Sequence, residues 1–345
     1  MSLIDEDIKG LIDPKVIAFF RNKRILVTGA SGLVGSYFSV LFQTINENHE
    51  GKIQLYLSSN SGIFLFAVGE ETMPIVGSLT IPSTLSKIQD FDVIIHAAGY
   101  AQPSKFLSQP FETMTLNIQV TIDLLQKLGP GGKLLYLSSS EVYSGLSEPP
   151  FVEEQIGISN TNHLRAPYIE AKKCGEVVIS THNKLNLGSR AVAARLSLAY
   201  GPGTRSDDTR VLSSFIAQAI STGEIRMKDS GSAWRTYCYV KDAISQMIEI
   251  LISGDEELYN VGGESRVQII ELAKIVASLT NATLIAPTDV GNFQIGAPDD
   301  VRLDLTRVKR IWHESGFTNL IAGVGNTIAW SREIRTLEDK DGCNS

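Results

Sequence analysis

Short apolar runs alternate with helical patterns along most of the chain. Strands are predicted at 24–27, 53–57, 92–96, 133–137 and 189–195, and an amphipathic helix is predicted over 111–128. This alternation is typical of an α/β protein in which helices cover both faces of a parallel sheet. We therefore predict a doubly wound parallel sheet, followed by a smaller mixed C-terminal lobe that begins near residue 201.

The two ends of the chain have patterns of their own. Ile4, Ile8 and Leu11 recur at helical spacing before Asp13-Pro14, which predicts two short helices in an N-terminal extension over 1–22. We expect this extension to pack on the main domain, and the alternative is a helix for a partner or a membrane surface. Acidic residues argue against a secretory signal, and no apolar run suits a membrane span. The polar tail over 336–345 is expected to fray.

Composition narrows the class of protein. The 345 residues are 43% hydrophobic and 20% charged, which suits a globular chain of roughly two units. Its net charge of −7 argues against a general nucleic-acid binder but leaves room for a locally basic pocket. Cys174, Cys238 and Cys343 are too few and scattered for a disulfide framework or a metal site, so we expect free thiols, no metal and a cytoplasmic location.

A glycine-rich turn follows the first predicted strand. Gly29, Gly32 and Gly35 are spaced so that the backbone can approach a pyrophosphate at the start of the following helix. Between these glycines, Ser31, Leu33 and Val34 complete the turn. A purely steric need for glycine is the alternative. With a strand before it and a helix after it, the turn predicts a dinucleotide site.

The end of the second predicted strand departs from the usual pattern. An acidic residue there normally holds the adenosine ribose, but this chain has Ser58-Ser59-Asn60-Ser61. It offers neither a carboxylate for NAD nor an arginine for the phosphate of NADP, so the choice between the two stays open. We expect Ser59 or Asn60 to bind the ribose hydroxyls.

Tyr168 and Lys172 stand four residues apart, so they share one face of a predicted helix. A nearby ammonium group lowers the pKa of a phenol, which can then act as a base, and it can also reach the nicotinamide ribose. Ser139 follows a strand at the sheet edge where ligands bind, and its hydroxyl can share a proton with Tyr168. The alternatives are a solvated surface pair and a serine that caps a helix.

These residues together resemble the extended short-chain dehydrogenase/reductase family, whose members modify nucleotide sugars. Further shared motifs are His96-Ala97-Ala98-Gly99, Asn117, the 195–203 and 235–242 segments, and 259–263. The resemblance implies a Rossmann domain over 23–200, to which part of 236–265 returns, and a nucleotide-sugar-binding lobe mainly over 201–335. It also implies that Ala97, Ala98, Gly99 and Asn117 contact the cofactor, and that the protein is a homodimer.

Within that family, Ser139-Ser140-Glu141 is most similar to the Thr-Ser-Glu of UDP-glucuronate decarboxylases. This similarity implies a catalytic set of Tyr168, Lys172, Ser139, Ser140 and Glu141, and a substrate-binding set of Arg210, Arg235 and Arg302. Leu198 and Val301 depart from the family pattern. The expected activity is NAD-dependent decarboxylation through a 4-keto sugar. The alternatives are a 4,6-dehydratase, a 4-epimerase, or an inactive homologue that serves as a scaffold.

Overall fold

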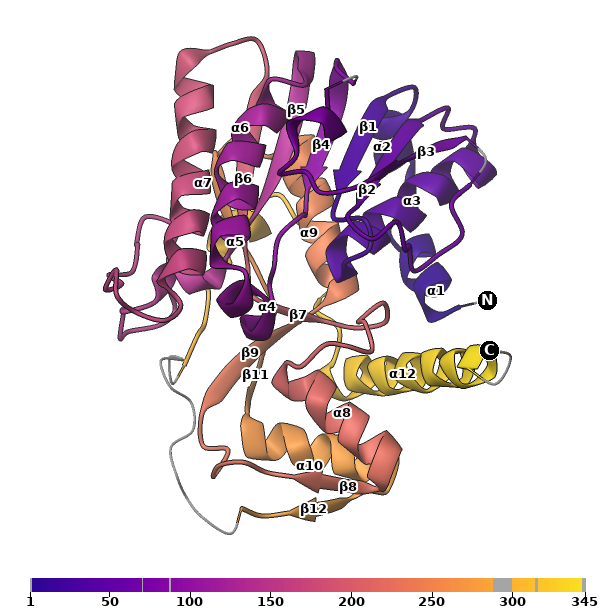
Figure 1. Cartoon of the computed structure of the whole chain (residues 1–345), viewed down its shortest axis with the longest axis vertical. Coiled ribbons are helices and arrows are strands. Elements are labelled where there is room, and N and C mark those ends of the chain that lie inside the picture. Colours follow the sequence, from indigo (N-terminus) through magenta and orange to yellow (C-terminus); the bar gives the residue numbers. More distant parts are fainter. Residues whose placement is uncertain (1, 70, 87, 288–299, 314–315, 343–345) are drawn as a thin grey trace.

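A seven-stranded parallel sheet forms the core of the upper lobe in the computed structural model (Figure 1), with strand order β10-β6-β5-β4-β1-β2-β3. Its strands are β1 (Arg24–Thr28), β2 (Gln54–Ser59), β3 (Thr72–Val76), β4 (Phe91–His96), β5 (Leu128–Ser139), β6 (Arg190–Leu196) and β10 (Leu258–Val261). The structure describes residues 2–69, 71–86, 88–287, 300–313 and 316–342. The order reverses on either side of β1, which confirms the predicted doubly wound Rossmann sheet.

Helices cover both faces of this sheet because its inner strands are apolar on both sides. Successive side chains of a strand point to opposite faces, so Ile25 packs on one side and Leu26 on the other. The first face is covered by α3 (Leu33–His49) and α9 (Val240–Ser253). The second is covered by α5 (Pro110–Asn117), α6 (Gln119–Leu125) and α7 (Ala166–Leu185).

Two elements differ from their predictions. The helix expected over 111–128 is interrupted at Ile118, which separates α5 from α6, and β5 already begins at Leu128. The Asn117 amide donates to the Thr113 carbonyl at 2.7 Å, a local bond that competes with the helical backbone pattern. Strand β3 was not predicted. As an edge strand with Pro74 and exposed side chains, it lacks the apolar run of an inner strand.

A smaller mixed lobe lies below the large sheet (Figure 1), as predicted. Its strands are β7 (Leu198–Tyr200), β9 (Trp234–Tyr239) and β11 (Ser265–Gln268) in one sheet, and β8 (Glu224–Arg226) and β12 (Thr283–Ile285) in another. Strand β9 pairs in parallel with β7 and antiparallel with β11. The helices of this region are α8 (Val211–Thr222), α10 (Ile269–Thr280) and α12 (Leu320–Gly342), whereas the short α11 (Thr306–Lys309) packs against β10 of the large sheet.

Two short helices occupy the N-terminal region, namely α1 (Leu3–Lys9) and α2 (Pro14–Phe20). Their boundaries follow from local chemistry, because Ser2 and Asp13 accept hydrogen bonds from the first turn of each helix. Asp7 is buried, and its Oδ2 accepts hydrogen bonds from the Tyr37 hydroxyl of α3 at 2.8 Å and the Tyr239 hydroxyl of β9 at 2.9 Å. The Asn326 amide of α12 donates to the same Tyr239 hydroxyl at 3.2 Å. Helix α1 therefore joins both lobes.

Residues 336–342 of the C-terminal tail, where fraying was expected, continue a helix. Helix α12 continues through Leu337 and ends at Gly342, and the last three residues lie outside the described part of the chain. Cys174 and Cys238 are free thiols, while Cys343 lies outside the described residues. Within the described residues, every helix is too short or too polar to span a membrane.

Candidate active site

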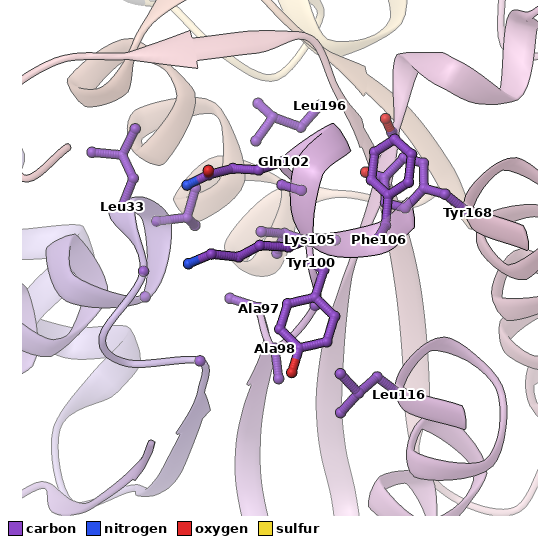
Figure 2. A pocket seen from close by; sticks show the side chains of 18 of the residues that line it. Leu33, Ala97, Ala98, Tyr100, Gln102, Lys105, Phe106, Leu116, Tyr168 and Leu196 are labelled. Carbon is purple, nitrogen blue, oxygen red and sulfur yellow. The ribbon is translucent and has the colours of Figure 1, made fainter. Parts of the chain in front are cut away.

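A cleft of about 470 Å³ opens at the carboxyl ends of the central parallel strands, where open α/β sheets bind ligands (Figure 2). The structure brings most of the predicted site residues to its lining. These are Gly29, Ser31, Gly32, Leu33, Val34, Gly35, Asn60, Ala97, Ala98, Gly99, Ser139, Ser140, Glu141, Tyr168, Lys172 and Arg210. Of the other predicted residues, Ser59, Asn117, Arg235 and Arg302 do not line it.

The glycine turn is built for close backbone approach. Gly29 has a φ of +66°, and a Cβ there would lie 2.6 Å from the Ala97 carbonyl oxygen. A Cβ at Gly35 would lie 2.2 Å from the Gly29 carbonyl oxygen, so α3 packs tightly against the turn. Gly32 is the N-cap of α3 and offers no side-chain cap, which leaves backbone N–H groups of the first turn facing the cleft. These donors and the helix dipole suit a pyrophosphate.

The end of β2 corrects one predicted ribose contact. Ser58 and Asn60 line the cleft, whereas Ser59 between them faces the opposite way, as strand alternation requires. The Ser59 hydroxyl donates to the Ile63 carbonyl at 3.3 Å and is buried. Asn60 therefore remains the expected ribose contact, together with Ser58, which the sequence did not single out.

Asn117 is a second correction, because it supports the site from behind instead of facing it. Its side chain is fully buried. The Asn117 Oδ1 accepts a hydrogen bond from the Tyr136 hydroxyl at 3.1 Å, which ties α5 to β5. This bond helps to fix the strand that carries Ser139.

Tyr168 lies on α7 with its hydroxyl beside Ser139. Burial raises the pKa of Tyr168 to about 12, while a hydrogen bond with Ser139 and the positive charges of Arg165 and Arg210 oppose that rise. The ring of Phe106, from the short helix α4 (Pro103–Ser108), stacks on the Tyr168 ring with centroids 4.6 Å apart. Figure 2 shows the two rings side by side at one end of the cleft.

Lys172 holds the end of β5 from the same face of α7. Its Nζ donates to the Leu137 carbonyl at 2.5 Å and lies 5.8 Å from the centroid of the Tyr168 ring. Burial lowers the pKa of Lys172 to about 7. The sequence predicted that Lys172 would leave Tyr168 with a lowered pKa, but the pKa of Tyr168 is raised because burial outweighs the nearby positive charges.

Glu141 forms an ion pair inside the cleft. Its carboxylate accepts two hydrogen bonds from the Arg165 guanidinium, one of them from Nε at 3.2 Å and the other from Nη2. Both side chains line the cleft and are mostly buried, and Arg165 also lies over the Phe106 ring at 5.3 Å. No role was predicted for Arg165 from the sequence.

The predicted substrate arginines separate in the structure. Arg210 lines the cleft, where its guanidinium contacts both carboxylate oxygens of Asp208. Arg235 on β9 donates instead to the Trp234 carbonyl at 2.6 Å, and Arg302 donates to the Pro149 carbonyl at 3.0 Å. These two therefore stand outside the cleft. Their motifs reflect sequence likeness, which does not by itself fix where a side chain points.

Two segments meet in one wall of the cleft, and the sequence did not predict the contact between them. Gln102 and Lys105 point across the cleft toward Leu33, as Figure 2 shows. Lys105 Nζ lies 3.0 Å from Asp207 Oδ2, which connects α4 to the loop over 204–210. More than ninety positions separate these segments along the chain, so a local pattern holds no signal for their contact.

A buried ion pair supports the catalytic end from below. Arg195 contacts both carboxylate oxygens of Glu176, at 2.9 and 2.7 Å, and Glu176 also accepts a 2.5 Å hydrogen bond from the Ser138 hydroxyl. Arg195 donates further to Tyr143, which ends the short helix η2 (Ser140–Tyr143). The pair thus joins α7, β5 and β6 below the predicted catalytic residues.

Known proteins share both the sequence pattern and the fold. The NAD dependent epimerase/dehydratase family matches residues 25–262. UDP-glucuronic acid decarboxylase 5 from Arabidopsis thaliana is 27% identical over 297 residues, which cover 84% of this chain and 84% of that protein.

Two solved structures are similar to the whole described fold. The epimerase Mth375 from Methanothermobacter thermautotrophicus has a TM-score of 0.79 and 21% identity, and the match covers 94% of this chain and 96% of that one. MoeE5 in complex with UDP-glucuronic acid and NAD has a TM-score of 0.74 and 20% identity, covering 90% and 99%. With the family match spanning well over half of its length, the chain belongs to the NAD dependent epimerase/dehydratase family.

Proposed function

We propose that this protein is a lyase that decarboxylates UDP-glucuronic acid through a 4-keto sugar, with NAD as its cofactor. One observation carries this proposal: Tyr168, Ser139 and the Glu141–Arg165 pair gather at one end of a cleft that begins at a pyrophosphate-type glycine turn. The relatives named UDP-glucuronic acid decarboxylase support the choice of substrate.

The residues present fit the cofactor. Side chains at Gly29 and Gly35 would collide with the backbone, so glycine at these positions allows the tight turn that a bound pyrophosphate needs. When bound, NAD supplies the hydride acceptor and later the hydride donor, which leaves the overall reaction redox neutral. We assign the pyrophosphate to the first turn of α3 and the nicotinamide ribose to Lys172.

In the first step, Tyr168 acts, once deprotonated, as the base that removes the proton from the hydroxyl at carbon 4 of the sugar. Burial raises the pKa of this phenol to about 12, and the hydrogen bond with Ser139 and the positive charges of Arg165 and Arg210 oppose that rise. The stacked Phe106 excludes water from one face of the ring. The carbon 4 hydride leaves in the same step, so the product is a ketone.

In the second step, the ketone at carbon 4 makes the carboxylate on carbon 5 a β-keto acid. The bond between carbons 5 and 6 breaks, carbon dioxide leaves, and the electron pair moves to the carbon 4 oxygen, where Tyr168 and Ser139 hold it. We assign the departing carboxylate to Arg165 and the proton delivered to carbon 5 to the region of Glu141. Ser140 stands where a 4,6-dehydratase needs an acidic side chain, which favours decarboxylation over loss of water.

Incubation with UDP-glucuronic acid labelled with ¹³C at the carboxyl group tests the proposal. We expect labelled carbon dioxide and a UDP-pentose in equal amounts, measured by mass spectrometry. Tyr168→Phe removes only the hydroxyl and should lower kcat by about 10²–10⁴-fold, with NAD binding retained. An enzyme that holds NAD but releases no label from this substrate is not a decarboxylase.

The same assay separates the alternatives. A 4-epimerase converts UDP-glucuronic acid into UDP-galacturonic acid without loss of label, and a 4,6-dehydratase turns UDP-glucose into a 4-keto-6-deoxy sugar. A scaffold homologue turns over none of these substrates. The intact set of Tyr168, Lys172, Ser139 and Glu141 in the cleft supports an enzyme over a scaffold.

We further propose a homodimer that works in the reducing cytoplasm. Helices α5 and α7 pack against each other and expose large apolar side chains, among them Phe111 at 83% and Val177 at 62%. A second copy of the same two-helix face is the partner that suits such a surface. The free thiols of Cys174 and Cys238 support the reducing compartment.

A further inference from the structure

At one end of the cleft, the turns that follow β1, β2 and β3 contribute polar lining residues, and none of the lining residues described in these turns is charged. The polar side chains at this end are Ser31, Ser58, Asn60, Ser61 and Ser78. Two backbone hydrogen bonds draw the strand ends together: Ala30 N–H donates to the Ser58 carbonyl at 3.0 Å, and Gly77 N–H donates to the Ser59 carbonyl at 3.1 Å. These turns therefore form one continuous surface beside the glycine turn.

Charge in the cleft is concentrated elsewhere. The charged lining residues are Lys105, Glu112, Glu141, Arg165, Lys172, Arg205, Asp208 and Arg210. They belong to α4, α5, α7, η2 and the 204–210 loop. Glu112 touches this end, because its carboxylate accepts a hydrogen bond from Ser78 Oγ at 3.4 Å, but it comes from α5 and bonds to the turn after β3, not to the end of β2.

This neutrality bears on how the cleft selects its dinucleotide. A carboxylate at the end of the second strand accepts hydrogen bonds from the ribose hydroxyls of NAD and repels the 2′-phosphate of NADP. Here the cleft-facing position after β2 is Asn60, whose side chain is exposed. An amide both donates and accepts, so it can bind a hydroxyl or a phosphate without repulsion.

Resting on the proposed dinucleotide site, we propose that this subsite takes the 2′-phosphate of NADP as well as the 2′-hydroxyl of NAD, because the residue at the end of β2 is the neutral Asn60. The neighbouring hydroxyls of Ser58 and Ser61 add further donors for the phosphate oxygens. At this position the chain thereby omits the charge-based exclusion of NADP that an acidic residue provides.

Calorimetric titration of the purified full chain with NAD⁺ and with NADP⁺, without sugar, tests this inference. We expect the two dissociation constants to agree within about tenfold. Asn60→Asp adds one negative charge to an exposed position, so it should weaken NADP⁺ binding by at least about tenfold and leave NAD⁺ binding intact. Added salt should shrink that loss, because screening acts on charge.

Asn60→Ala is the matched control, since it removes the amide without adding charge. Its ratio of the two dissociation constants should stay within about threefold of the wild-type ratio if the absence of a carboxylate governs selection. A wild-type protein that binds NAD⁺ about 100-fold more tightly than NADP⁺ overturns the inference and leaves the proposed function standing. An Asn60→Asp protein with an unchanged ratio overturns the role of Asn60. If neither dinucleotide binds, the inference and the proposed function fail together.

Discussion

At the scale of single residues, burial governs the chemistry of the site. Tyr168 and Lys172 are both nearly inaccessible, and burial shifts their pKa values toward the neutral forms, to about 12 and about 7. The cleft therefore starts from a protonated phenol and a lysine that titrates near neutral pH. A charged substrate or cofactor that binds in the cleft can therefore change the protonation of Tyr168 and of Lys172.

Lys172 links folding stability to pH. Its folded pKa of about 7 lies below the ordinary lysine value of 10.5, so the unfolded chain binds more protons between these values and stability rises with pH there. Relative to Lys172→Met, the wild type should gain up to about 1.4 kcal/mol of unfolding free energy per pH unit above pH 7. Urea unfolding at several pH values measures this difference. Lys274→Met, at an exposed lysine on α10, is the matched control for loss of a lysine side chain.

Arg195 is the residue whose loss should destabilise the catalytic end most. Arg195→Met leaves the mostly buried Glu176 carboxylate without its partner, which should cost about 3–5 kcal/mol of unfolding free energy. Ser138→Ala removes one hydrogen bond to the same carboxylate and should cost about 0.5–1.5 kcal/mol. Adding Glu176→Gln to Arg195→Met should restore part of the loss. If it restores nothing, the unpaired charge is not the cause.

At the scale of elements, helix α1 is held by a buried carboxylate. Burial raises the pKa of the Asp7 carboxyl above the usual aspartate value, and hydrogen bonds from Tyr37 and Tyr239 oppose that rise. Protonated Asp7 therefore stabilises the folded protein. This stabilisation is complete below the pKa that Asp7 has in the unfolded chain, and it is lost as the pH rises through the pKa that Asp7 has in the folded chain. In the wild type, the ionised Asp7 lowers the free energy of unfolding at neutral pH, and its protonation at lower pH removes this loss.

Asp7→Asn removes this titration and keeps an acceptor for the two tyrosines. The free energy of unfolding of the wild type, measured relative to this variant by urea at pH 4 to 7, should increase as the pH falls. Other titrating groups cancel in the difference. Glu271→Gln, at an exposed site on α10, provides the baseline. A difference that grows toward neutral pH contradicts the raised pKa.

The sequence predicts strands well where both faces of the strand are buried, and it predicts other elements less well. Inner strands such as β1 and β4 are continuous apolar runs, and their positions follow from that pattern. Edge strand β3 has exposed positions and a proline, so no period marks it. The break between α5 and α6 depends on a side-chain hydrogen bond of Asn117 that no apolar pattern encodes.

The residues of the candidate site also differ in how well the sequence predicts them. Local motifs sufficed for the glycine turn and for Tyr168 with Lys172, because each is a short segment whose own geometry sets its direction. Which of Ser58, Ser59 and Asn60 faces the cleft depends on strand register, and one residue of uncertainty reverses the answer. Phe106 and Lys105 reach the cleft through tertiary packing of α4, so they could not be found from local spacing.

At the scale of the whole molecule, the apolar face of α5 and α7 should decide the oligomeric state. Light scattering after size exclusion should report a dimer, and Phe111→Asp with Val177→Asp should yield a folded monomer, because a charge on each helix opposes burial of the face. Leu279→Asp on α10 is partly exposed at 38% and lies outside this face, so it should remain dimeric. A wild-type protein that is monomeric in this measurement contradicts the proposed homodimer.

The Asp7 contact has a consequence for truncation. Helix α1 and helix α12 both contact the hydroxyl of Tyr239, the first through Asp7 and the second through Asn326. The two terminal helices thus share one buried tyrosine of β9. A variant shortened at either end should expose this hydroxyl and weaken the attachment of the helix that remains.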